Sequence, residues 1–403
     1  MNRPDLRAPL FTMALFVSAF LLFWVEPLFT KSALPALGGS SRVWNTALVF
    51  FQTGLLGGYL WAHLLTRKLP LGAQVGIHLA LVAVAVLTFP VLAPPDLQAP
   101  AHEIPIPWFL AVCAASLGLP FVVLSATTPL LQSWFSELEH EHASDPYFLY
   151  AASNAGSLLA LLAFPFLLAP RLALGRQGEL WEAGYGVFFL LAAACGALAW
   201  WARRGGRSRS EAEDSEPHRS GSGRSDARDS GAVAVGGAVR PGSSTSGPDA
   251  SPWRERFAWV AFSFVPASLL HGVTSHVTVE IAAVPLFWVV PLAIYLLTFV
   301  FVFARREWIP HRWMLAVEPH FLVVTVMLIF LPSIEQNYTW LMLVHLGTLF
   351  VVSMVCHGEL ARRRPGAERL TDFYLWLAAG GALGGAFNAL VAPYAFDTLI
   401  EYP

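Results

Sequence analysis

Eleven apolar runs of about 20 residues or more divide this 403-residue chain. A helix needs roughly 20 such residues to cross a bilayer core about 30 Å thick, because each residue rises about 1.5 Å and every backbone amide must be satisfied internally. We therefore predict an all-α, polytopic transmembrane helical bundle surrounded by the lipid bilayer. The predicted spans are residues 9–30, 43–66, 72–93, 107–134, 147–169, 183–202, 257–278, 281–304, 313–332, 338–358 and 371–395.

The composition supports this prediction and excludes several other classes. Hydrophobic residues make up 56% of the chain and charged residues only 13%. A formal net charge of −2 leaves no basic surface for nucleic acid, so we exclude that partner. Cys113, Cys195 and Cys356 lie far apart within apolar runs, which predicts neither a disulfide framework nor a metal site. We also expect no cofactor.

Residues 203–254 form the one long polar segment and hold 16 of the charged side chains. The segment is rich in Ser, Gly, Arg and Asp, and it cannot bury enough apolar area to offset the loss of chain entropy on folding. We predict a disordered cytoplasmic linker at 203–254. It separates a first membrane half at 1–202, with six spans, from a second half at 255–403, with about five.

A weak internal repeat relates the two halves. Asp145 and Tyr147 match Asp372 and Tyr374 at a constant offset of 227, and three alanines after each pair keep that offset. Both segments enter the membrane from the same side, so the repeat predicts two parallel halves of six spans each. A twelfth span is then expected after Pro403.

The orientation follows from the Lys and Arg residues in short loops, which are retained on the cytoplasmic side during insertion. If the N-terminus is cytoplasmic, the linker and the loops that follow the second, eighth and tenth spans are the basic ones. We therefore predict a cytoplasmic N-terminus and a cytoplasmic linker. The loop at 136–146 is acidic, but acidic residues contribute little to topology.

Glu26 lies well inside an apolar run. A carboxylate in the bilayer costs about 2.5–3.5 kcal/mol on insertion scales, so Glu26 must be paired, protonated or exposed to water. Glu26 is a candidate site for a substrate cation or a proton, with Pro27 opening the helix beside it. Alternatively, it is a helix-end carboxylate that meets solvent or Lys31. Lys31 lies about 140° around a regular helix, so a direct pair needs a bend at Pro27.

Two later spans carry polar side chains among apolar neighbours. Thr127 and Thr128 precede Pro129, and Gln132 follows it, so these groups can line a polar cavity or replace the lost backbone bond. Asn154 can form a hydrogen bond across helices or face a substrate. Close helix packing is the structural alternative for both spans.

His271, His276 and Glu280 belong to the densest polar cluster of the second half. Imidazoles that titrate near neutral pH beside a carboxylate are suited to proton coupling. The spacing of five between the histidines differs from the three or four of a helical metal pair, which argues against a metal site. The alternative is an ordinary extracytoplasmic loop.

Several segments together resemble one protein family. They are FLLFWVEPLFTK at 20–31, the GG turn at 38–39 with Val43 and Trp44, GLPFVVLSATTPLLQSW at 118–134, YFLYAASNAGSLLALLAFP at 147–165 and VPLFWVVPLAIYLL at 284–297. These segments resemble the membrane region of bacterial spermidine-synthase-like proteins. In that family a helical region of the major facilitator type precedes a soluble aminopropyltransferase-like domain. The resemblance implies a multi-pass protein of the bacterial inner membrane.

The family's soluble domain would follow Pro403, and residues 1–403 include none of its glycine-rich or acidic site motifs. We therefore predict no catalytic residues and no aminopropyl transfer for these residues. The resemblance implies a transporter-like protein that binds or moves a small, polyamine-like metabolite. The alternative is a non-transporting membrane anchor or scaffold that positions a soluble synthase-like partner at the cytoplasmic face.

Overall fold

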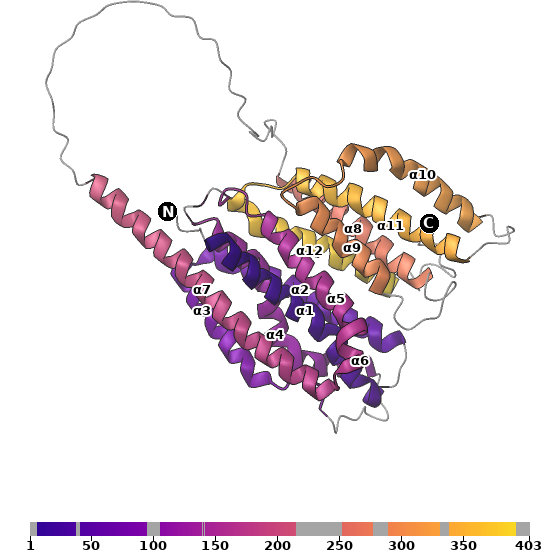
Figure 1. Cartoon of the computed structure of the whole chain (residues 1–403), viewed down its shortest axis with the longest axis horizontal. Coiled ribbons are helices and arrows are strands. Elements are labelled where there is room, and N and C mark those ends of the chain that lie inside the picture. Colours follow the sequence, from indigo (N-terminus) through magenta and orange to yellow (C-terminus); the bar gives the residue numbers. More distant parts are fainter. Residues whose placement is uncertain are drawn as a thin grey trace, which may run out of the picture.

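The computed structural model describes residues 6–37, 41–94, 105–138, 140, 142–214, 252–276, 289–330 and 338–391. These ranges fold into eleven long helical segments, which confirms the predicted all-α bundle (Figure 1). The first half consists of α1 (Arg7–Leu37), α2 (Ser41–Lys68), α3 (Leu71–Ala85) with a 3₁₀ turn at Val86–Thr88, α4 (Pro105–Phe135), α5 (Phe148–Ala163) with a π-helical turn at Phe164–Leu168, α6 (Ala169–Arg171) and α7 (Leu174–Asp214). The second half consists of α8 (Pro252–His276), α9 (Val289–Phe303), α10 (His311–Phe330), α11 (Tyr338–Arg362), a 3₁₀ turn at Ala367–Arg369, and α12 (Leu370–Ala386) with a π-helical turn at Phe387–Val391.

Eight helical segments within the described ranges are long and apolar enough to cross a membrane. They are Arg7–Pro35, Thr46–Lys68, Leu71–Thr88, Pro107–Phe135, Phe148–Arg171, Leu174–Gly205, Pro252–His276 and Thr339–Arg362. The remaining three predicted spans correspond to weaker helices. Helix α9 has only 15 residues and α12 only 17, and α10 begins with the polar residues His311 and Arg312.

Two boundaries differ from the sequence prediction. Helix α7 covers Leu174–Asp214, whereas the predicted span is 183–202, and its last part lies in the segment predicted to be a linker. Hydropathy marks only the apolar part of a helix, while Arg and Glu are good helix formers that extend it into water. Residues 215–251 lie outside the described residues. The seventh and eighth predicted spans contain α8 and α9, and residues 277–288 between them lie outside the described residues.

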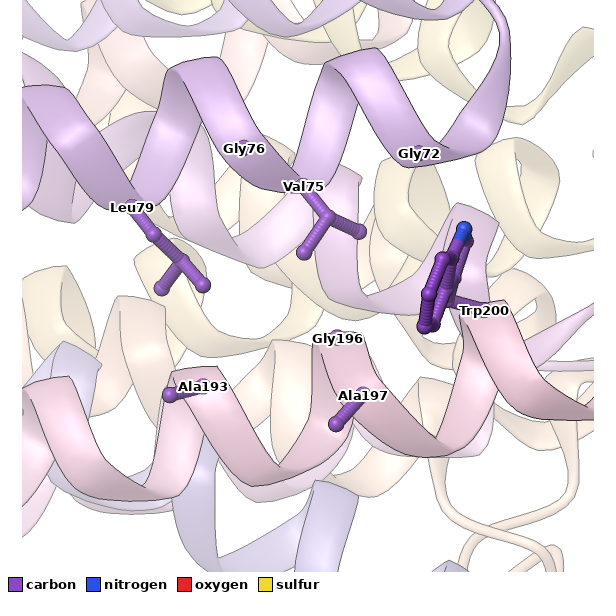
Figure 2. A pocket seen from close by; sticks show the side chains of 8 residues that line it. All are labelled: Gly72, Val75, Gly76, Leu79, Ala193, Gly196, Ala197 and Trp200. Atoms are coloured by element: carbon purple, nitrogen blue, oxygen red, sulfur yellow. The ribbon is translucent and has the colours of Figure 1, made fainter.

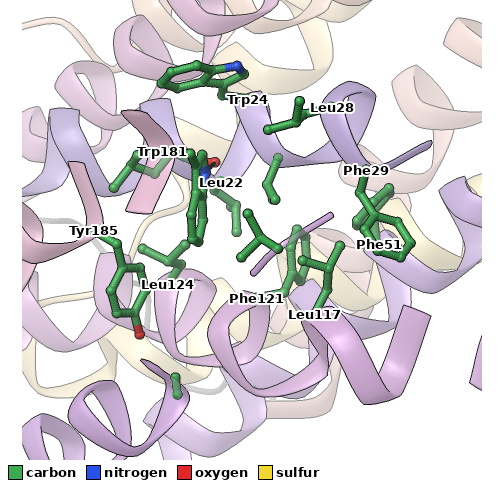
Figure 3. Packing of buried hydrophobic residues seen from close by; sticks show 14 of the residues in the cluster. Leu22, Trp24, Leu28, Phe29, Phe51, Leu117, Phe121, Leu124, Trp181 and Tyr185 are labelled. Carbon is green, nitrogen blue, oxygen red and sulfur yellow. Dashed lines mark hydrogen bonds between the residues drawn. The ribbon is translucent and has the colours of Figure 1, made fainter. Parts of the chain in front are cut away.

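Large aromatic side chains fill the core of the first half, where α1, α4 and α7 meet (Figure 3). The ring of Trp181 stacks on that of Tyr185 with their centroids 5.4 Å apart. The indole N–H of Trp181 donates a hydrogen bond to the carbonyl of Leu21 at 2.8 Å, and the hydroxyl of Tyr185 donates to the carbonyl of Val82 at 3.1 Å. The polar atoms of these buried rings are thereby satisfied, as burial requires.

Helices from opposite halves pack against each other along a central interface. Figure 1 shows α1–α7, coloured from indigo to magenta, as one group and α8–α12, coloured orange and yellow, as the other. Helix α2 packs on α12, and α5 packs on α9. We call the end of the bundle where α2 and α11 end and α8 and α12 begin the basic end, because it carries Arg67, Lys68, Arg203, Arg204, Arg254, Arg256, Arg305, Arg306, Arg362, Arg363, Arg364 and Arg369.

Candidate functional site at the interface of the two halves

Gln132 connects the two halves. Its side-chain oxygen accepts a hydrogen bond from the hydroxyl of Tyr374 on α12 at 2.8 Å, and its amide donates to the carbonyl of Thr128 at 3.3 Å. Gln132 is fully buried. Of the three predicted site residues around Pro129, Gln132 is the one with a hydrogen bond to the opposite half.

The other two predicted residues of α4 bond within the first half. The hydroxyl of Thr127 donates to the carbonyl of Val123 at 2.7 Å and lies 3.2 Å from the ring nitrogen Nε2 of His78 on α3. The hydroxyl of Thr128 lies 3.3 Å from that of Ser153 on α5. Both side chains therefore join helices of the first half.

Asn154 also bonds locally. Its side-chain amide donates to the carbonyl of Tyr150, one turn earlier on α5, at 2.8 Å. The side chain is buried. This hydrogen bond places the amide group of Asn154 against its own helix, next to the residues of α5 that reach the interface.

His271 on α8 lies at the interface opposite Gln52 on α2. Its ring nitrogen Nδ1 is 2.9 Å from the carbonyl of Ala267, which can only accept, so in a neutral ring Nδ1 carries the proton. The other nitrogen, Nε2, is then an acceptor for the amide of Gln52 at 3.4 Å. Gly385 on α12 allows this approach, because a Cβ atom there would collide with the Gln52 side chain.

The remaining histidine of the predicted cluster does not join this contact. The ring of His276 lies against the ring of His345 on α11, with centroids 4.6 Å apart. Glu280 lies outside the described residues. Within the described ranges no three His, Cys, Asp or Glu side chains gather in a way that could hold a metal ion.

Glu26 is half-buried on α1, and Lys31 is exposed. Phe23, one turn before Glu26, packs against the cluster that Leu161 of α5 forms with Val289 and Leu296 of α9, so Glu26 lies near the place where the halves meet. Among the described residues the Glu26 carboxylate has no hydrogen bond or ion pair, and Lys31 does not pair with it. Helix α1 begins at Arg7, and Glu26 lies roughly 28 Å farther along this helix. It is therefore toward the end of the bundle that lies opposite the basic end.

Four tyrosines close the interface nearer the basic end, and sequence reasoning missed them as a group. The ring of Tyr374 has its centroid 4.9 Å from that of Tyr150, 5.9 Å from that of Tyr147 and 6.1 Å from that of Tyr59. We call these residues the tyrosine cluster. They come from α2, the start of α5 and α12, and each is at most 6% exposed.

The tyrosine cluster contains the residues that the internal repeat relates. The hydroxyl of Tyr374 donates to Gln132 in the first half, and the hydroxyl of Tyr147 donates to the carbonyl of Pro365, which precedes α12, at 3.0 Å. Each of the two equivalent tyrosines therefore bonds to the opposite half. The repeat was the sequence signal that could have identified this contact.

Further polar contacts join the halves beside the tyrosine cluster. Thr371 on α12 has its hydroxyl 3.1 Å from Nδ1 of His63 and 3.1 Å from the hydroxyl of Thr66, both on α2. Arg364 donates to Asp145 at 2.7 Å. Together with the packed rings, these contacts hold the interface closed at the basic end.

A charged network stabilises the start of α12. The guanidinium of Arg256 on α8 makes a two-pronged contact with Asp372, at 3.1 Å and 3.2 Å, and the indole of Trp376 donates to the same carboxylate at 3.1 Å. Burial disfavours the charge of Arg369, but its hydrogen bond to Glu255 at 2.7 Å and the negative charges of Glu255 and Asp372 together outweigh this and raise the pKa of its guanidinium. The network fixes the start of α12, which contains Thr371 and Tyr374.

The arrangement is a buried seam between two helical halves. It is closed by tyrosines and hydrogen bonds at the basic end, and toward the other end lies the Glu26 carboxylate, which has no partner among the described residues. Such a seam can bind a small solute between the halves if the two helix groups move apart. The residues on the seam are mostly hydrogen-bond donors and acceptors, with aromatic faces between them.

Solved transporter structures have the same fold. A human organic anion transporter aligns at a TM-score of 0.57 with 13% identity, over 97% of this chain and 93% of that one. A proton:xylose symporter of the major facilitator superfamily, bound to 6-bromo-6-deoxy-D-glucose, aligns at 0.52 with 12% identity, over 97% and 89%. An outward-facing bacterial homologue of the iron transporter ferroportin aligns at 0.52 with 14% identity, over 95% and 92%.

Sequence comparison adds no family to this likeness. No family model matches the chain, and no curated protein matches it. Neither comparison therefore supports the resemblance to spermidine-synthase-like membrane regions. The structural likeness, at identities of 12–14%, concerns the fold alone. The chain is a multi-pass membrane protein with the fold of major facilitator superfamily transporters.

Proposed function

We propose that this protein is a membrane transporter that carries a small, polyamine-like cation between its two halves. The observation that carries the proposal is the Glu26 carboxylate, which is half-buried near the interface and has no partner among the described residues. The resemblance of residues 20–31 to a spermidine-synthase-like membrane region adds the substrate class. The likeness of the fold to solved transporters supports the movement of a solute between the two halves.

The physical reason is the cost of a charge in lipid. An ionised carboxylate at membrane depth is costly unless a cation or proton neutralises it, so intramembrane acidic residues commonly mark ion and substrate pathways. A protonated amine would supply both the opposite charge and N–H donors for Glu26. Charge-assisted hydrogen bonds of this kind contribute about 1.5–3 kcal/mol, or more than tenfold in affinity.

The path proposed for the cation follows from which end is closed. The tyrosine cluster and the contacts of Thr371 close the basic end, so the substrate enters from the opposite end, where Glu26 lies. It leaves when the halves separate at the basic end. There the ammonium group passes the faces of aromatic rings, which attract cations.

Uptake into proteoliposomes tests the proposal. Vesicles with the purified chain should accumulate labelled spermidine but not a neutral sugar such as labelled xylose. Glu26→Gln should lower the uptake at least tenfold. The matched control is Glu179→Gln, because Glu179 is exposed and pairs with Arg176 on the surface, and this variant should transport like the wild type.

Three outcomes would count against the proposal. Equal spermidine uptake by Glu26→Gln and the wild type would remove Glu26 from the path. Accumulation of xylose with no spermidine uptake would replace the cation by another substrate. No uptake of either compound, combined with capture of a soluble synthase-like protein, would favour the scaffold function.

A further inference from the structure

A groove runs along the outer surface of the first half between α3 and α7 (Figure 2). Its volume is about 430 Å³. Small residues line much of it, among them Gly72 and Gly76 on α3 and Ala193 and Gly196 on α7. Gly76 is exposed, and a Cβ atom built on it would meet no other atom within 4 Å. The groove therefore has room for a chain-like apolar ligand.

The two ends of the groove differ in charge. At the end nearer the basic end, the guanidinium carbon of Arg204 lies 3.9 Å from the centre of the Trp200 ring, which lines the groove. Lys68, four residues before Gly72, is exposed and has no ion pair among the described residues. Toward the other end, Leu79 and Ala193 make the lining apolar (Figure 2).

A phospholipid has the same division into a charged and an apolar part. Trp is enriched at the level of lipid headgroups, which is the level that Trp200 indicates for this end of the groove. Lys and Arg at that level attract anionic headgroups. We propose that the groove is a binding site for one phospholipid with an anionic headgroup, from the leaflet at the basic end. Its phosphate lies near Lys68 and Arg204, and one acyl chain lies over Gly76 and Ala197, because Gly196 is buried against Val75.

A second copy of the chain fits this groove less well. Copies inserted in the same orientation present their basic ends to the same leaflet. A dimer built on the groove would bring Lys68 and Arg204 of one copy close to the same cations of the other, and like charges repel. An anionic headgroup is instead attracted to both cations.

Native mass spectrometry of the delipidated, detergent-solubilised chain tests the site. The chain is titrated separately with phosphatidylglycerol, which is anionic, and phosphatidylcholine, which has no net charge. Phosphatidylglycerol should bind more tightly, and Lys68→Gln and Arg204→Gln should each reduce that preference about fivefold, since a surface cation contributes about this factor. Phosphatidylcholine also carries a phosphate, but its trimethylammonium group offsets that charge, so its binding should fall less than that of phosphatidylglycerol in either variant.

A second pair of variants tests the apolar part. Gly76→Leu fills the groove and should reduce the binding of both lipids. Gly186→Leu is the matched control, because Gly186 is another exposed glycine with open space around it, on α7 outside the groove. Thermal unfolding of both variants in detergent verifies that they remain folded.

Three results would overturn the proposal. The first is equal binding of the two lipids by the wild type. The second is lipid binding by Gly76→Leu that equals that of Gly186→Leu while both are folded. The third is a dimer in the wild type that Gly76→Leu dissociates, which would assign the groove to a second copy.

Discussion

Gly58 on α2 offers a quantitative test of how tightly the helices pack. A Cβ atom there would collide with the hydroxyl oxygen of Ser125 and would lie 2.7 Å from the carbonyl oxygen of Val122 and 2.9 Å from the amide nitrogen of Ala126, all on α4. The last two atoms are backbone and cannot rotate away. The neighbouring Gly57 is the matched control, because a Cβ atom there would meet nothing within 4 Å.

The expected magnitude follows from the difference between the two variants. Alanine gains about 0.5–1 kcal/mol over glycine within a helix, and this gain is common to Gly57→Ala and Gly58→Ala, so it cancels. Overpacking a filled interior costs about 1–3 kcal/mol. Gly58→Ala should therefore be about 1–3 kcal/mol less stable than Gly57→Ala.

The assay is reversible unfolding of the two purified variants in mixed micelles with increasing denaturing detergent, followed by tryptophan fluorescence. A lower midpoint for Gly58→Ala, with the same slope, is the expected result. Equal midpoints would refute the close approach of α2 and α4.

Three further predictions concern the second half and the interface. Gly380→Ala should destabilise the protein by about 1–3 kcal/mol relative to Gly381→Ala in the same unfolding assay. A Cβ atom at Gly380 would meet α8, whereas a Cβ atom at Gly381 would meet nothing within 4 Å. Equal stability of the two variants would contradict the contact between Gly380 and α8. Arg256→Gln should lower stability by about 1–3 kcal/mol, since it leaves the buried Asp372 carboxylate with fewer donors; an unchanged midpoint would show that the pair contributes little. Tyr374→Phe removes one hydrogen bond between the halves. Such a bond contributes about 0.6 and at most about 1.7 kcal/mol in membrane proteins, so the open fraction at the basic end should rise roughly 3- to 18-fold. Maleimide labelling of a single cysteine placed behind the tyrosine cluster measures that opening, and an unchanged rate would exclude a closing role for the bond.

The helices could be predicted from the sequence because hydropathy and length suffice to identify them. The ends of α7 could not, because polar helix formers extend a helix beyond the apolar stretch that a span prediction detects. Helix α9 covers Val289–Phe303 of the span predicted at 281–304, and residues 277–288 lie outside the described residues.

The candidate site was harder to predict, because a side chain's direction depends on which helices pack together. Thr127 and Gln132 lie on the same predicted span, yet one bonds to α3 and the other to α12. Gln52 was missed because a single amide in an apolar run carries no periodic signal. Tyr147 and Tyr374 could have been found, since the repeat pairs them and equivalent elements of parallel halves meet near the symmetry axis.

The decisive measurement asks whether the halves must separate for transport. The hydroxyl oxygens of Thr66 and Thr371 are 3.1 Å apart across the interface, so Thr66→Cys with Thr371→Cys can form a disulfide, whereas the native cysteines are buried. Oxidised protein in proteoliposomes should stop taking up labelled spermidine, and dithiothreitol should restore uptake to the level of the single variants. Undiminished uptake by fully cross-linked protein would contradict transport between the halves.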